Sequence, residues 1–179
     1  MNARVAQEIR TGRLELLPLC VEHAEEMAAV LSDPALHTFV GGAPDTPRGL
    51  RSRYRRLAAG SPDPDVSWLN WVVRLRAESC LTGTVQATVR PAEAGPLAEI
   101  AWVVGTPWQG RGIAGEAARA LVGWLGRQQV HTVIAHIHPE HRASAAVATA
   151  AGLAPTAHRH EGEIRWQRGE GGPEGPVSH

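Results

Sequence analysis

Apolar and polar side chains alternate along three stretches in the middle of the chain, the pattern of strands that bury one face. These stretches are residues 66–76, 81–90 and 97–104. The alternation is nearly perfect in the second stretch, which predicts a half-buried strand. The third stretch is more continuously apolar, so we expect both of its faces to be covered.

Four other stretches repeat apolar residues every three to four positions, which is typical of amphipathic helices. They are residues 21–31, 46–59, the segment that begins at Ile113, and residues 143–151. Shorter strands are predicted at residues 13–19, 132–137, 153–158 and 163–167. This order predicts a single domain over residues 1–168. The glycine- and proline-rich residues 169–179 predict a disordered tail.

Composition narrows the class of protein. The formal net charge of zero argues against a dedicated nucleic-acid binder. No run approaches the roughly 18 apolar residues that a membrane span requires. Two cysteines, Cys20 and Cys80, suggest no disulfide framework, so reduced thiols are expected. We therefore expect a cytoplasmic monomer or homodimer with no nucleic-acid or membrane partner.

A glycine-rich loop separates the strand at 97–104 from the helix that begins at Ile113. Glycine lets a backbone approach a ligand closely, and the first turn of a helix offers unpaired N–H groups. The loop therefore predicts a diphosphate site. A P-loop is excluded because the chain contains no lysine. A dinucleotide fold fits poorly, because Gln128 and Gln129 stand where an acidic ribose ligand is required.

The third kind of diphosphate loop is the coenzyme A motif Q/R-x-x-G-x-G/A, and residues 109–114 match each of its fixed positions. Through this motif the chain resembles the GNAT superfamily of acyl-CoA-dependent N-acyltransferases. The resemblance covers residues 12–168. Residues 14–19, 32–34, 139–144 and 150–153 are similar to the branch of ribosomal-protein N-terminal alanine acetyltransferases. The resemblance to the superfamily implies an α+β fold. Its sheet would be mixed and mostly antiparallel, with one splayed parallel strand pair, and helices would flank it.

The resemblance also implies the coenzyme site. Acetyl-CoA would be the cosubstrate, and its pantetheine arm would lie where the strand at 97–104 splays from that at 132–137, on backbone groups of Val103 and Val104. His141 and Ser144 are further expected contacts, although His141 replaces the asparagine that is usual in this branch. The loop residues expected to bind the coenzyme are Gln109, Gly110, Arg111, Gly112, Ile113 and Ala114.

Glu99 is the candidate general base, because an acid in an apolar strand is poised to take up a proton. The segment Ala98-Glu99-Ile100 is also similar to the strand of the histone-type members, in which the glutamate is the base. The alternative is a glutamate on the polar side of a strand.

The sequence contains no tyrosine at the position from which the family protonates the leaving thiolate. Many family members use a tyrosine at the position of Ala148, and the single tyrosine, Tyr54, is far away in sequence. Ser144 and His141 are the nearby candidates. We favour departure of the coenzyme A thiolate without a proton donor, since the pKa of its thiol lies near that of free cysteine, about 8.5.

Other conspicuous residues receive structural interpretations. We expect Trp68, Trp71, Trp102 and Trp124 in the core, and Trp108 at the base of the glycine loop. The five arginines of residues 48–56 are expected on a solvated helix face. The histidines at 136, 138 and 141 are expected to line the site or face solvent, and no metal is expected.

These features predict an enzyme that moves an acetyl group from acetyl-CoA to a primary amine. The acceptor is either a protein N-terminus or a small-molecule amine. The absent tyrosine and the altered asparagine leave open a GNAT-like module that binds acyl-CoA without turnover.

Overall fold

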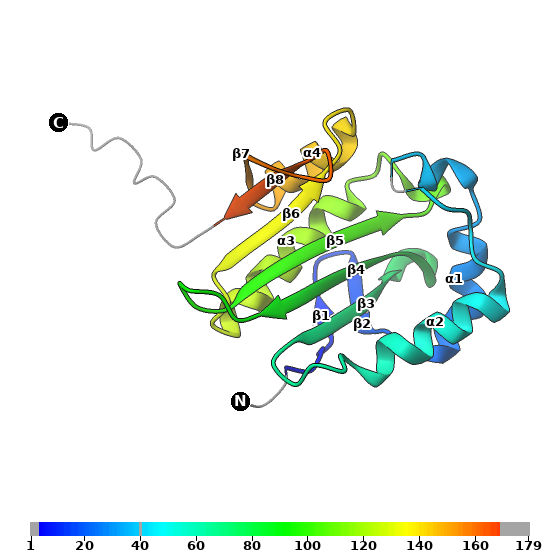
Figure 1. The fold of residues 1–179 in the computed structure, drawn as a ribbon. Helices are drawn as coiled ribbons and strands as arrows, with labels where there is room; N and C mark the ends of the chain where they lie inside the picture. The colour runs from blue at the N-terminus through cyan, green and yellow to red at the C-terminus, as the bar shows by residue number, and fades with distance from the viewer. Residues whose placement is uncertain (1–3, 40, 169–179) are drawn as a thin grey trace.

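The computed structural model describes residues 4–39 and 41–168, and the predicted tail at 169–179 lies outside them. Within this part the strands form one sheet in the order β1-β2-β3-β4-β5-β6-β8-β7 (Figure 1). Its strands are β1 (Ile9–Arg10), β2 (Leu14–Pro18), β3 (Ser67–Leu75), β4 (Cys80–Arg90), β5 (Leu97–Val104), β6 (Thr132–Ile137), β7 (Ala154–His160) and β8 (Glu163–Arg168). Among the paired strands described, only β5 and β6 run parallel.

Four α-helices cover the sheet. They are α1 (Ala24–Val30), α2 (Pro47–Ala59), α3 (Ile113–Arg127) and α4 (Arg142–Ala150). The helices α3 and α4 pack on one face, and α1 and α2 pack on the other, over β3 and β4 (Figure 1). The α+β fold predicted from the sequence is therefore confirmed.

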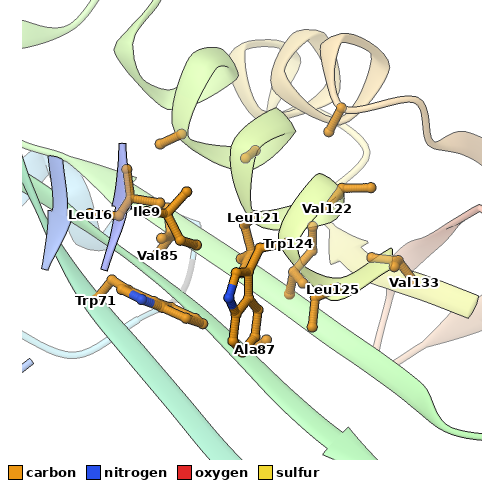
Figure 2. Packing of buried hydrophobic residues seen from close by; sticks show 14 of the residues in the cluster. Ile9, Leu16, Trp71, Val85, Ala87, Leu121, Val122, Trp124, Leu125 and Val133 are labelled. Carbon is orange, nitrogen blue, oxygen red and sulfur yellow. The ribbon is translucent and has the colours of Figure 1, made fainter. Parts of the chain in front are cut away.

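The larger core lies between α3 and the sheet. Leu121, Trp124 and Leu125 of α3 meet Trp71 of β3 and the inward side chains of the central strands (Figure 2). The rings of Trp71 and Trp124 meet edge to face, with centroids 5.3 Å apart, a favourable geometry for aromatic pairs. One hydrophobic cluster includes residues of α3 and of every strand from β1 to β6, so both halves of the sheet share a core with α3.

The helix boundaries follow from local chemistry. The hydroxyl of Thr46 accepts a hydrogen bond from the backbone N–H of Gly49 at 3.0 Å, and Pro47 follows at the first helical position. Both features were expected for α2. The predicted helix at 21–31 divides into a 3₁₀ turn, Val21–His23, and the shorter α1. The two-residue strand β1 was missed, since two residues show no periodicity.

Two expectations about burial are wrong. The strand β5 is covered on one face only, because α1 and α2 lie over β3 and β4 and leave Ala101 exposed. Trp68 is 36% exposed on the same open face, so it is not a core residue. Trp71 and Trp124 are buried as expected, and Trp102 is half-buried.

The parallel pair is short, and this positions the site. β5 and β6 pair only at Leu97 with Thr132, Ala98 with Val133 and Glu99 with Ile134. Beyond Glu99 they diverge, while β5 stays paired to β4 as far as Val104. The remaining backbone edge of β5 therefore faces a gap. The predicted splayed pair is confirmed.

Candidate active site

The gap between the diverging strands opens into a cavity of about 1090 Å³, here called the main cleft. Residues 100–104 of β5 form one wall, and residues 135–138 form the other. The glycine loop and α4 close one end, while α1, α2 and the segment between them close the other. The main cleft thus joins the predicted diphosphate loop to the open face of the sheet.

The glycine loop leads directly into α3. Gly110 and Gly112 both have φ of +76°, in the left-handed region that glycine adopts most easily. Gly112 is the residue that precedes α3, and it has no side chain that can cap the first turn. The N–H groups at the start of α3 are therefore available to an anion.

Side chains hold this loop from behind. The Nη1 of Arg13 donates to the carbonyl oxygen of Arg111 at 2.9 Å, and its Nε lies 2.8 Å from Oε1 of Glu116. Thr11 also donates to Glu116. Burial alone would raise the pKa of Glu116, but the hydrogen bonds from Thr11 and Arg13 outweigh it and lower that pKa. The carboxylate thus remains ionised. These contacts behind the loop were not predicted from the sequence.

Two loop residues are already engaged within the protein. The side-chain amide of Gln109 donates to the carbonyl oxygen of Val104 at 3.0 Å, which ties the loop to the end of β5. Arg111 donates to Oε1 of Glu78 at 2.9 Å. The hydrogen bond from Arg111, followed by one from Trp108, lowers the pKa of Glu78. Trp108 packs against the larger core under α3 and also against the smaller hydrophobic cluster under α1 and α2. It therefore fills the base of the loop, as expected.

Glu99 lies on the open face of β5. Its side chain is 37% exposed, and its Oε1 lies 2.7 Å from Nδ1 of His136 on β6. A carboxylate accepts hydrogen bonds, so a proton on Nδ1 would face Glu99 and would leave Nε2 as the acceptor. The apolar strand does not bury this carboxylate. His136 lines the main cleft, whereas Glu99 lies behind it in a smaller cavity that His136 also lines.

The other predicted site residues converge on the main cleft, except Arg111, which is not among its lining residues. Val103, Val104, His141 and Ser144 all line it, together with Gln109, Gly110, Gly112, Ile113 and Ala114 of the loop. Phe39 lies over two histidine rings, with centroids 4.4 Å from His141 and 5.0 Å from His138. Burial, and then the charge of His138, lower the pKa of His141, so its ring is neutral at neutral pH.

Tyr54, far from the other site residues in sequence, lies at the main cleft in the folded chain. It is buried on α2 and lines the main cleft. Its hydroxyl has no hydrogen-bond partner in the described part of the chain. Burial raises the pKa of Tyr54 to about 12, so the hydroxyl stays protonated. Ala148, the position of the family tyrosine, is fully buried.

Two observations concern metals and membranes. Within residues 4–39 and 41–168, no group of three or more His, Cys, Asp or Glu side chains is arranged to hold a metal ion. The helices described in the same ranges include none that is long and apolar enough to cross a membrane.

A parallel strand pair that diverges beside a glycine loop defines an acyl-coenzyme A-dependent transferase fold. The model of the Acetyltransferase (GNAT) domain matches residues 13–154. The chain therefore belongs to the GNAT acetyltransferase family. No curated protein sequence matches the chain significantly.

Solved structures share the fold. RimL, a ribosomal L7/L12 alpha-N-protein acetyltransferase in complex with coenzyme A, aligns with TM-score 0.73 and 16% identity, over 90% of this chain and 97% of RimL. The ribosomal-protein-S5-alanine acetyltransferase from Vibrio fischeri aligns with TM-score 0.70 and 18% identity, over 90% and 96%. AAC(6')-Ib, in complex with an aminoglycoside and acetyl-CoA, aligns with TM-score 0.71 and 16% identity, over 88% and 94%.

Proposed function

We propose that the protein transfers an acetyl group from acetyl-CoA to a primary amine in the main cleft. The observation that carries the proposal is the continuity of this cleft, which joins the glycine loop and the free edge of β5 to His136, the partner of Glu99. RimL with coenzyme A and AAC(6')-Ib with acetyl-CoA support the choice of cosubstrate.

The coenzyme would lie along the gap. Its diphosphate meets the backbone N–H groups of residues 110–114 at the positive end of α3. Its pantetheine arm runs along β5, where Val103 and Val104 offer backbone groups to the thioester. A backbone N–H there stabilises the carbonyl oxygen as it becomes an oxyanion. The bond from Gln109 to Val104 fixes the distance between these two parts of the site.

The acceptor amine must lose a proton as it attacks the thioester carbon. His136 lines the cleft and has Nε2 free to take that proton, while Glu99 balances the charge that forms on the ring. The new C–N bond replaces the C–S bond, and the thiolate leaves unassisted. His141 and Ser144 line the cleft at the expected thiol end of the coenzyme, and they are the alternative proton donors to the sulfur.

Thiol release tests this function. Purified protein is mixed with acetyl-CoA and a panel of acceptors, and free coenzyme A is measured with a thiol reagent. The panel pairs short peptides that have free α-amines with small amines and aminoglycosides, so it also separates the two acceptor classes. Coenzyme binding without thiol release from any acceptor would favour the non-catalytic module, since His141 and Ala148 depart from the family pattern.

The cellular compartment and the oligomeric state belong to the same proposal. We infer a cytoplasmic monomer or homodimer formed by one domain over residues 1–168. The unpaired Cys20 and Cys80 support a reducing compartment. Sedimentation of the full chain measures the oligomeric state, and cell fractionation measures the location.

A further inference from the structure

A second cavity, of about 410 Å³, lies beside the main cleft and is here called the basic cavity. Six basic side chains and one acidic side chain line it, together with Ile134. They are Arg90, Arg159, Arg165, His136, His158, His160 and Glu99. Since guanidinium groups stay charged at all physiological pH values, the arginines alone give this cavity a positive potential.

The protein does not neutralise this charge internally. No ion pair joins Arg90, Arg159 or Arg165 to an acid in the part of the chain that the structure describes. Glu99, the one carboxylate in the cavity, has its Oε1 2.7 Å from Nδ1 of His136. The Nε of Arg165 is buried and has no hydrogen-bond partner among the described residues. A buried donor without an acceptor is unfavourable, so this group suits an anionic ligand.

The basic cavity adjoins the place where the acceptor amine would react. His136 lines both cavities, and Arg165 lies opposite His136 in the β6–β8 ladder. The rings of His136 and His160 lie 5.1 Å apart, so β7 closes the far side. A molecule with its amine at His136 therefore directs its next group toward Arg165.

We propose that the basic cavity binds an anionic group, a carboxylate or a phosphate, carried by the acceptor close to its amine. The inference rests on the proposed function, because it assigns the substrate class of the same site. Arginine recognises carboxylate and phosphate oxygens with paired, charge-assisted hydrogen bonds. Such contacts would place the amine beside His136 and select anionic acceptors over neutral ones.

Matched acceptors test the proposal. Phosphoethanolamine is compared with ethanolamine, and alanyl-aspartate amide with alanyl-asparagine amide, whose C-termini carry no charge, so that the two arms separate phosphate from carboxylate. In at least one arm we expect kcat/KM for the anionic acceptor to exceed that of its neutral partner by about tenfold or more at low salt. The preference should shrink as ionic strength rises.

Variants of the cavity locate the effect. Arg165→Gln and the more exposed Arg159→Gln should lower the ratio of anionic to neutral kcat/KM, while Arg165→Lys, which keeps the charge, should retain part of it. Arg55→Gln, on the exposed face of α2, is the matched control and should leave the ratio unchanged. Melting temperatures verify that each variant folds.

Equal use of both members of each pair, with a ratio unaffected by Arg165→Gln, would overturn the inference and leave the proposed function intact. Absence of thiol release with every acceptor would instead contradict the proposed function. Calorimetry then still tests the cavity, with phosphoethanolamine added to the coenzyme-loaded protein. Binding that Arg165→Gln weakens supports the anion site, and no binding to the wild type refutes it.

Discussion

Oε1 of Glu99, the last β5 residue that pairs with β6, lies 2.7 Å from Nδ1 of His136, two residues beyond the pairing partner Ile134. In the proposed mechanism this contact favours the tautomer with the proton on Nδ1, which leaves Nε2 as the proton acceptor. In the proposed mechanism Glu99 therefore acts on the amine through the ring of His136 and not from inside an apolar strand.

Replacing Glu99 with glutamine should lower turnover at neutral pH, by up to the roughly 10²–10⁴-fold contribution of the general base, His136, that Glu99 positions. The defect should shrink as the pH approaches the pKa of the acceptor amine, because solution then supplies the neutral amine. Initial rates of thiol release over a pH series measure both effects. Glu93→Gln, at an exposed position between β4 and β5, is the control.

The double variant Glu99→Gln with His136→Gln should be little worse than the single variants, since the two groups act as a unit. Equal activity of Glu99→Gln and the wild type at neutral pH, with saturating acceptor, would remove Glu99 from the reaction.

Gly112→Val should abolish coenzyme binding. A β-branched residue strongly disfavours φ of +76°, and the added bulk lies where the diphosphate must approach the backbone. Calorimetry with coenzyme A measures the loss. Gly126→Ala, later in α3 with open space around it, should bind as the wild type does. Wild-type affinity in Gly112→Val would show that the loop is not the diphosphate site.

The sequence predicts those parts of the site whose residues are adjacent in the chain, and it does not predict contacts that depend on the tertiary structure. The loop at 109–114 and the first turn of α3 are adjacent in sequence, so the motif alone indicates their role. The contact of Glu99 with His136 requires the register of β5 against β6, and this depends on where the strands stop pairing. Tyr54 reaches the cleft only because α2 crosses the sheet, a tertiary contact without a sequence pattern. The same holds for the exposure of Ala101.

Tyr54→Phe should stabilise the protein by about 1 kcal/mol, because it removes a buried hydroxyl that lacks a partner. Urea unfolding at neutral pH measures the change. The wild type should also lose stability as pH rises from about 10 to about 12. In that range the unfolded chain releases the tyrosine proton and the folded chain keeps it.

The phenylalanine variant lacks this titration, so its advantage should grow across the same pH range. Lower stability of Tyr54→Phe at neutral pH would mean that the hydroxyl has a partner in solution. A large fall in turnover without a change in stability would instead indicate that the hydroxyl contacts the reactants.

Truncation after Arg168 should leave coenzyme binding and turnover near wild type. The removed residues 169–179 are rich in glycine and proline and contain little apolar surface. Calorimetry and thiol release on the truncated chain provide the comparison. A loss of several-fold in either would extend the functional domain beyond Arg168.

The three-residue ladder between β5 and β6 has a mechanical consequence. It divides the sheet into two parts, β1–β5 and β6–β8, which pair over only three residues and share the hydrophobic core that contains α3. A pantetheine arm bound in the gap would give the unpaired backbone edge of β5 new partners. It would also fix the angle between the two parts of the sheet. Loading with coenzyme should therefore slow amide hydrogen exchange in β6 and β8 as well as in the loop. The enzyme would then be most rigid only while its cosubstrate is bound.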